Sequence, residues 1–135
     1  MAILAHVLQI VGWWIPPLVI FLVKRESKFT AFHALQALFL QALYLLVAGI
    51  GMIFWFATIF LIMAHAPATR NAPPPPAFFI VMPLLWLGWM GMWVTMMVIV
   101  VVYGIKAGRG EWAEYPFFGR LSRRILKLGP GGVPL

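Results

Sequence analysis

Three long apolar runs constrain this chain more than any other feature of its sequence. They cover about residues 3–23, 29–64 and 78–105, and each is long enough to cross a hydrocarbon core of roughly 30 Å. The chain is 64% hydrophobic and 10% charged, whereas a globular domain is about half apolar and about a quarter charged. The sequence therefore predicts an all-α membrane protein with three transmembrane helices.

Prolines and glycines mark where these runs should bend or end. Pro16 and Pro17 remove two amide donors from the first run, so we expect a kinked helix there. The second run would be about 54 Å long as one helix, so we expect its first turns to lie in the membrane interface, or the helix to tilt or to bend near Gly49 and Gly51. Residues 65–77 contain four consecutive prolines and predict a short external loop.

Basic residues are distributed unevenly between the predicted loops. Lys24, Arg25 and Lys28 separate the first two runs, and six more cations follow the third. The loop between the second and third runs has only Arg70, and the amino end has no lysine or arginine. The positive-inside rule then predicts a multi-pass membrane protein with its N-terminus outside and its C-terminus in the cytoplasm.

The segment 117–128 predicts a cytoplasmic amphipathic surface helix. Its apolar residues share one arc of about 100° on a helical wheel, and its cations occupy the adjacent side. These cations are Arg120, Arg123, Arg124 and Lys127. Such a helix suits a surface of anionic lipids. We therefore expect a three-span domain at 1–116, this basic helix at 117–128 and a flexible tail at 129–135.

The second run opens with a stripe of polar side chains: His33, Gln36, Gln41 and Tyr44. One interpretation is that they bond to neighbouring helices, including carbonyls freed by the prolines of the first run, at about 0.6 to 2 kcal/mol for each bond. The other is a polar cavity or partner contact at the cytoplasmic side. We favour the first interpretation.

Histidines and tryptophans raise the alternative of a bound pigment. His6, His33 and His65 are candidate ligands for a haem or a (bacterio)chlorophyll, and the tryptophans would suit a flat ligand. Tryptophans also favour membrane interfaces and helix packing faces, and we prefer that explanation. The sequence requires no cofactor, although bound lipids are expected.

Catalytic motifs are missing from the sequence. We find no nucleophile arrangement, no phosphate-binding loop and no metal-ligand spacing, so we expect no enzyme, no metal site and no small-molecule substrate. The three glutamates lie outside the apolar runs, which disfavours a carboxylate-coupled pump. The net charge of +7 is explained by topology and lipid contact, so no nucleic acid is needed as a partner.

Several short motifs occur in a characteristic order. Gly12 to Pro16 is followed by KRES at 24–27, by FHALQAL at 32–38, and by a segment after the third run. That last segment contributes Lys106, Ala107, Gly110, Glu111, Tyr115 and Pro116. Over about residues 8–120 the chain resembles the Tic-twenty-like family, small bacterial membrane proteins of unknown function related to a component of the chloroplast inner-envelope import translocon. The resemblance implies the membrane fold and a location in the bacterial inner (cytoplasmic) membrane.

Three functions are open at this point. The first is a non-enzymatic accessory subunit that packs against a larger respiratory, photosynthetic or translocating membrane complex. The second, implied by the resemblance, is a homo-oligomeric translocon-like channel. The third is a subunit of a photosynthetic or electron-transfer complex that contacts pigment or haem. We favour the accessory subunit, because the chain is too small to enclose a pore by itself.

Overall fold

The computed structural model describes residues 1–65, 73–129 and 132. Within these residues the regular structure is helical and no β-strand occurs, which confirms the all-α prediction for this part of the chain. The chain forms two compact units. Unit 1 comprises Met1–Tyr44 with Met96–Leu135, and unit 2 comprises Leu45–Thr95.

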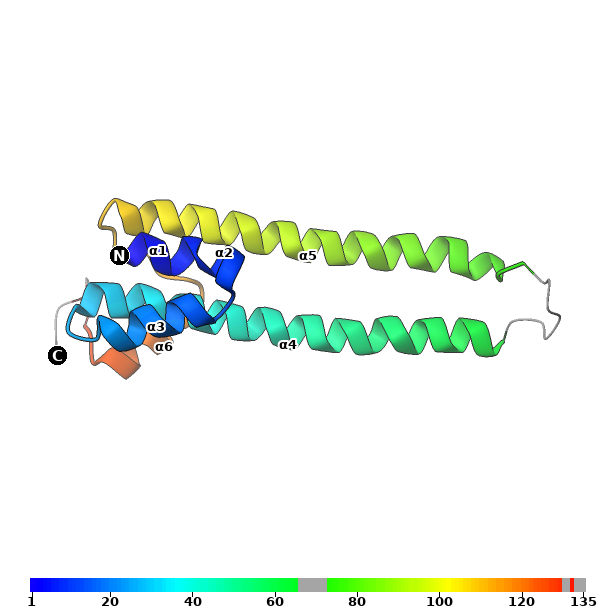
Figure 1. Ribbon diagram of the computed structural model, residues 1–135, viewed down its shortest axis with the longest axis horizontal. Coiled ribbons are helices and arrows are strands. Elements are labelled where there is room, and N and C mark those ends of the chain that lie inside the picture. The colour runs from blue at the N-terminus through cyan, green and yellow to red at the C-terminus, as the bar shows by residue number, and fades with distance from the viewer. Residues whose placement is uncertain (66–72, 130–131, 133–135) are drawn as a thin grey trace. The chain divides into compact units, whose positions relative to one another are not determined.

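The first apolar run is broken into three short helices. These are α1 (Ala2–Val7), α2 (Gln9–Gly12) and α3 (Ile15–Val23). The chain reverses at Trp13, whose φ of 58° lies in a region that side-chain-bearing residues rarely adopt. The following prolines lie in the first turn of α3, where a missing amide donor costs little. Helices α1 and α3 pack against each other, so the run forms a helical hairpin (Figure 1).

Neither arm of this hairpin is long enough to cross a membrane. Residues 2–12 rise by about 16 Å and the nine residues of α3 by about 14 Å, against a hydrocarbon core of roughly 30 Å. The expected crossing at 3–23 is therefore not confirmed. The sequence predicts one kinked helix, but the positive φ of Trp13, three residues before Pro16, turns the chain back.

Two helices in the described residues are long and apolar enough to span a membrane. They are α4 (Lys28–Ala64, 37 residues) and α5 (Pro76–Gly108, 33 residues). Only 6% and 11% of their most apolar stretches are buried within the protein, unlike the core helices of a soluble domain. The apolar surface of the chain is that of a membrane protein. Helix α4 stays unbroken through both of its interior glycines.

Unit 1 contains the hydrophobic core of the described residues. Leu40, Met96, Val100 and Tyr115 are buried together, and helix α6 (Phe118–Leu126) joins them through Phe118. Small residues on α4 and α5 permit close packing. A Cβ placed on Gly104, for example, would meet the side chain of His6 at 3.5 Å, which shows how closely α1 approaches α5.

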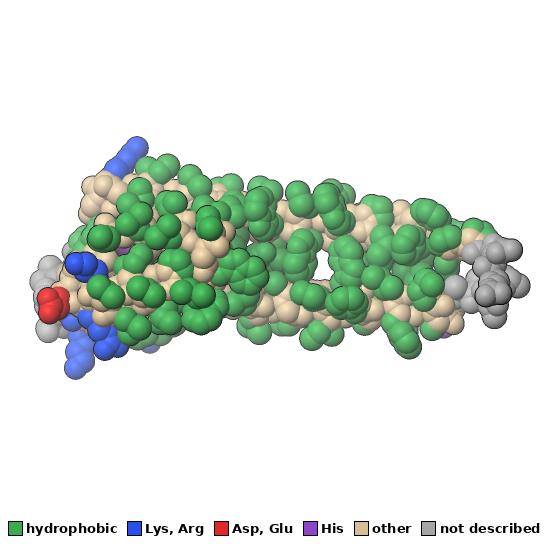
Figure 2. Space-filling view, viewed as in Figure 1, with side chains coloured by type: hydrophobic (Ala, Val, Ile, Leu, Met, Phe, Trp, Pro, Cys, Tyr) green, Lys and Arg blue, Asp and Glu red, His purple; other side chains and the backbone are tan. Residues whose placement is uncertain are grey.

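The two units also differ in their content of charged residues. Every lysine and arginine except Arg70 belongs to unit 1, as do all three glutamates. Figure 2 accordingly shows the basic side chains over the elements of unit 1 and hydrophobic side chains over the visible helices of unit 2. Residues 66–72 of the expected external loop, with Arg70, lie outside the described residues, as do 130, 131 and 133–135 of the expected tail.

Candidate functional site

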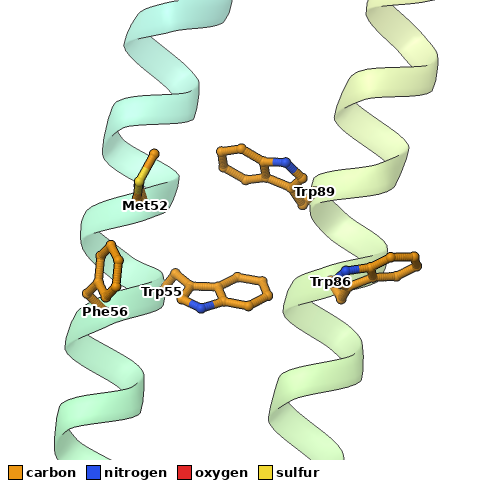
Figure 3. Close-up of a pocket in the computed structure, with 5 residues that line it drawn as sticks. All are labelled: Met52, Trp55, Phe56, Trp86 and Trp89. Carbon is orange, nitrogen blue, oxygen red and sulfur yellow. The ribbon is translucent and has the colours of Figure 1, made fainter.

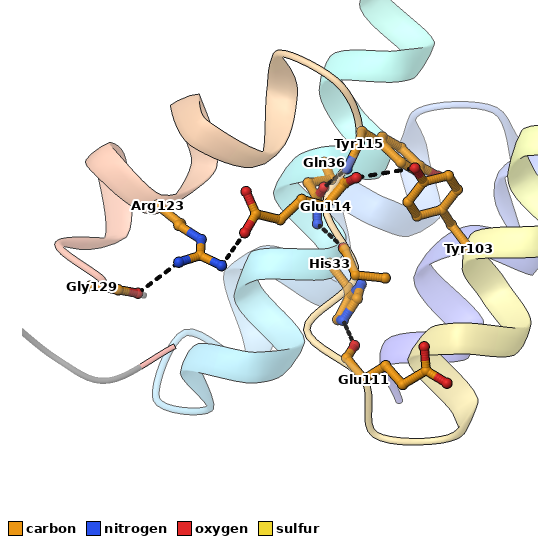
Figure 4. Close-up of polar contacts among 9 residues, drawn as sticks. His33, Gln36, Tyr103, Glu111, Glu114, Tyr115, Arg123 and Gly129 are labelled. Atoms are coloured by element: carbon orange, nitrogen blue, oxygen red, sulfur yellow. Dashed lines mark hydrogen bonds and ion pairs between the residues drawn. The ribbon is translucent and has the colours of Figure 1, made fainter. Parts of the chain in front are cut away.

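The segment that connects α5 to α6, residues 109–117, is held in place by side chains from helices α4 and α5. It has no helix of its own, so its backbone groups need other partners. Gln36 of α4 supplies two of them (Figure 4). Its Nε2 donates to the Ala113 carbonyl at 3.2 Å, and its Oε1 accepts from the Tyr115 amide at 2.6 Å. Tyr103 of α5 donates its hydroxyl to the Glu114 carbonyl at 3.0 Å.

A chain of hydrogen bonds connects the same segment to α1 and α4. The Tyr115 hydroxyl lies 2.8 Å from His6 Nδ1, and His6 Nε2 lies 3.2 Å from His33 Nδ1. His33 Nε2 lies 3.0 Å from the Glu111 carbonyl oxygen (Figure 4). We call these four groups the histidine relay. It joins the hairpin, the first long helix and the connecting segment.

The donor and the acceptor of every hydrogen bond in the histidine relay follow from its last member, the Glu111 carbonyl. A carbonyl only accepts, so His33 Nε2 carries a hydrogen and, in a neutral ring, His33 Nδ1 accepts. His6 Nε2 must then donate to it, and His6 Nδ1 accepts from the Tyr115 hydroxyl. All four ring nitrogens are used. The relay ends on a carbonyl that cannot take up a proton, so this arrangement tethers three elements and is not a path for protons.

The histidine relay is closed to solvent. His6 and His33 have no exposed surface, and Tyr115 is 3% exposed. Burial raises the pKa of the Tyr115 hydroxyl above its ordinary value, so this group stays protonated at neutral pH and remains a donor. Phe29 and Phe32 pack edge-on against the His33 ring, at centroid distances of 4.7 and 5.4 Å.

Two other buried glutamines lack partners among the described residues. Gln9 of α2 is 1% exposed and lies beside the Tyr115 hydroxyl, but neither its Oε1 nor its Nε2 makes a hydrogen bond of normal geometry. Gln41 of α4 is 2% exposed, and its Oε1 has no partner. Gln9 was not predicted as a site residue, because one glutamine in an apolar run follows no periodic pattern.

The structure places the predicted polar stripe in the interior of unit 1. His33, Gln36 and Gln41 are buried, and Tyr44 packs half-buried against the core cluster. The hydrogen-bond partners of the stripe differ from those we expected. They come from the connecting segment and from His6, and not from carbonyls freed by the first-run prolines.

The motif segment after α5 contributes to the same site in different ways. Tyr115 provides a side chain and Glu111 a backbone carbonyl, while Gly110 provides a turn with φ of 81°. Lys106 lies 5.4 Å from the ring centre of Tyr103, and Ala107 is buried. Pro116 is exposed at the end of the connecting segment.

The four cations assigned to the lipid surface fall into two groups. Arg120 and Arg124 of α6 and Lys127, the residue after it, are exposed. Arg123 instead pairs with the Glu114 carboxylate and donates to the Gly129 carbonyl at 2.9 Å (Figure 4). It therefore fastens α6 to the connecting segment. This is the only ion pair within the described part of the chain.

The three histidines proposed as pigment ligands are not brought together. His6 and His33 meet in unit 1, while His65 follows α4 in unit 2, where its Nδ1 lies 2.8 Å from the Leu61 carbonyl. No cluster of three or more His, Cys, Asp or Glu side chains that could hold a metal occurs among residues 1–65, 73–129 and 132.

Unit 2 contains an aromatic cavity of about 290 Å³ between its two helices. Met52, Trp55 and Phe56 of α4 line it together with Trp86 and Trp89 of α5 (Figure 3). The rings of Trp55 and Trp89 reach from opposite helices into the space between them. The cavity lining is almost entirely apolar, so it suits a hydrocarbon chain or a flat apolar molecule.

The comparisons with known proteins correct the resemblance drawn from the short motifs. The family model that matches covers residues 1–122 and describes the magnetosome magnetite crystal formation family, MamF_MmsF; it is not a Tic-twenty-like family. The motif order we used is short and dispersed, and it did not separate the two families. Neither the curated proteins nor the solved structures yielded a match. Because the match covers 122 of 135 residues, this chain belongs to the magnetosome magnetite crystal formation protein family.

Proposed function

We propose that this chain is a small integral membrane protein that contributes to the formation of magnetite crystals. The family match over residues 1–122 is the observation that carries this proposal. The two long apolar helices support a place in the membrane around the mineral. The proposal replaces a respiratory or photosynthetic complex as the setting, for which the comparisons give no support.

Within that process we assign the chain a non-enzymatic, architectural role. The ring nitrogens of the histidine relay are all engaged in tethering, and Glu114 is committed to Arg123. Iron binding at these side chains would have to break these contacts first. The exposed apolar surface of unit 2 and its tryptophan-lined cavity suit contact with lipid or with the helices of a partner protein, so the accessory-subunit hypothesis is retained with a partner from crystal formation.

The two other functions considered at the outset receive less support. The translocon-like channel was taken from the family resemblance that the comparisons overturn. Direct haem or pigment ligation by His6 or His33 would require a ring nitrogen to leave the histidine relay. His65 keeps one nitrogen outside any hydrogen bond with the described residues, but it has no second histidine beside it.

We further propose a topology with two membrane crossings and a re-entrant hairpin. Helices α4 and α5 cross, while α1–α3 enters the membrane and returns on the same side. The positive-inside rule then puts the N-terminus, Lys24 with its neighbouring cations and α6 in the cytoplasm. This differs from the outside N-terminus expected when residues 3–23 are taken as a full crossing.

Deletion of the gene in its native host tests the proposed role. We expect crystals that are altered in number, size or shape by electron microscopy, with recovery when the full-length chain is returned. A matched pair of complementing variants tests the site: Gln36→Leu, which removes two tethers, should restore less than Gln41→Leu, which removes an unpartnered amide. A host that forms no magnetite, or crystals unchanged by deletion, would contradict the proposal.

A further inference from the structure

The hairpin α1–α3 has an apolar outer surface but only enough length for half a bilayer. Val11 is 85% exposed, Ile15 56% and Val23 69%, so both arms require a hydrocarbon environment. Each arm rises by about 14 to 16 Å, which is about half the thickness of a hydrocarbon core. A hairpin of this length, with both ends on one side, occupies a single leaflet.

Helix α6 presents a second membrane-seeking surface in the same unit. Its inner face is committed to the protein, since Gly119 and Ser122 are buried. Its outer face carries two parallel ridges. Phe117, Leu121 and Ile125 form an exposed apolar ridge, which lies beside a ridge of exposed cations. The exposed cations are Arg120, Arg124 and Lys127. A helix with this outer face lies in the border region of an anionic leaflet, its cations at the lipid phosphates and its apolar ridge among the chains.

The hairpin and α6 are both tethered to the segment that connects α5 to α6. The histidine relay connects His6 of α1 to Tyr115, and Arg123 of α6 pairs with Glu114 one residue earlier. Phe118 of α6 also stacks on Phe39 of α4 at a centroid distance of 5.8 Å. A hairpin and a surface helix that are tethered in this way must enter the membrane together, on one side.

We propose that unit 1 inserts the α1–α3 hairpin and the outer face of α6 into one leaflet only, and that the chain therefore favours an anionic bilayer whose cytoplasmic leaflet is convex. A helix with its side chains is about 10 Å across, so each upright arm adds about 80 Å² to the leaflet it enters and nothing to the opposite one. Extra area in one leaflet is accommodated best where that leaflet is stretched by curvature. The inference rests on the membrane placement proposed above and adds the kind of membrane surface that this protein selects.

Orientation in vesicles of different size tests this inference. The chain has no cysteine, so Glu26→Cys gives a single label site in the exposed turn between α3 and α4. The full-length variant is reconstituted into vesicles of about 30 nm and about 400 nm diameter with mixed neutral and anionic phospholipids, sizes that bracket strong and weak curvature. A membrane-impermeant maleimide, added before or after detergent, measures the ratio of outward to inward label sites.

We expect the outward-to-inward ratio to be at least about twofold higher in the small vesicles, because their outer leaflet is convex. The difference should shrink when anionic lipid is omitted. It should also shrink in the Arg120→Gln/Arg124→Gln variant, while Arg109→Gln, an exposed cation outside α6, should leave it unchanged. Equal ratios at both sizes would overturn the inference. A size effect that ignores both lipid charge and the α6 arginines would overturn the part assigned to α6.

The outcome of this experiment can be distinguished from the outcome of the gene-deletion test of the proposed function. Equal ratios from a chain whose deletion alters the crystals would remove the leaflet preference and leave the role in crystal formation. A strong size effect from a chain whose deletion leaves the crystals unchanged would do the opposite.

Discussion

Replacing Gln36 by leucine should release the connecting segment from α4. The glutamine is fully buried and bonds two backbone groups, the Ala113 carbonyl and the Tyr115 amide. Leucine has a similar volume but no polar atoms. It would leave the Tyr115 amide buried and unpartnered, at a cost of about 1 to 3 kcal/mol. The half-buried Ala113 carbonyl can recover water, so its loss adds only about 0.5 to 1.5 kcal/mol.

The matched variant Gln41→Leu isolates this cost from the effect of adding an apolar side chain. Gln41 lies on the same helix and is 2% exposed, but its Oε1 has no partner. Both variants gain similar apolar burial, so the difference between them reports the lost bonds. We expect Gln36→Leu to be less stable than Gln41→Leu by about 2 to 4 kcal/mol. Hydrogen bonds inside lipid average only about 0.6 kcal/mol, but the connecting segment lies outside the long apolar helices.

Reversible unfolding in a mixed mild-detergent and dodecyl-sulfate titration, followed by circular dichroism, measures this difference. A second readout is amide hydrogen exchange in residues 109–117, which should accelerate in Gln36→Leu alone. Equal stabilities, or a difference below about 0.5 kcal/mol, would show that the hydrogen bonds of Gln36 do not hold this segment.

Two further substitutions test the same region of unit 1. Burial raises the pKa of the Tyr115 hydroxyl in the folded chain. The protonated hydroxyl therefore contributes fully to stability below the ordinary tyrosine pKa of about 10, and this contribution is lost as the pH rises above that value. Thermal stability in detergent should therefore fall less steeply at alkaline pH in Tyr115→Phe than in the wild type. The half-buried control Tyr44→Phe should follow the wild-type curve. Identical curves for all three proteins would contradict the role assigned to the buried Tyr115 hydroxyl. A Cβ on Gly119 would clash with the Glu114 side chain, so Gly119→Ala should destabilise the chain by about 1 to 3 kcal/mol and speed hydrogen exchange in α6. A Cβ on the control residue Gly88 has no atom within 4 Å, so Gly88→Ala should be neutral or stabilising. A Gly119→Ala protein as stable as this control would refute the close packing of α6.

The long helices could be predicted from the sequence because length and apolar content decide them. Helices α4 and α5 need only a run of apolar residues longer than the hydrocarbon core, and both runs satisfy that condition. The same criterion predicts a crossing at residues 3–23, which the structure does not confirm. There a single backbone angle, the positive φ of Trp13, converts a run of sufficient length into a hairpin, and no compositional measure reports one angle.

The histidine relay could not be predicted from the sequence for a different reason. The polar stripe beginning at His33 was visible as a helical face, but its partners lie 27 and 78 residues away, and His6 and Tyr115 are separated by 109 residues. Periodicity within one helix carries no information about such pairs. Likewise, Arg123 could not be separated from its neighbouring cations until the position of Glu114 was known.

Cysteine accessibility on the two sides of the membrane tests the central claim, the re-entrant hairpin, most directly. Three single-cysteine proteins are needed: one with a cysteine inserted after Met1, Glu26→Cys in the turn after the hairpin, and His65→Cys at the far end of α4. Each is expressed in cells and labelled with a membrane-impermeant maleimide before and after the inner membrane is opened. The account predicts that the first two cysteines react only after opening and the third before it. A cysteine after Met1 that reacts in intact cells while Glu26→Cys stays protected would place a full crossing at residues 3–23 and contradict the account.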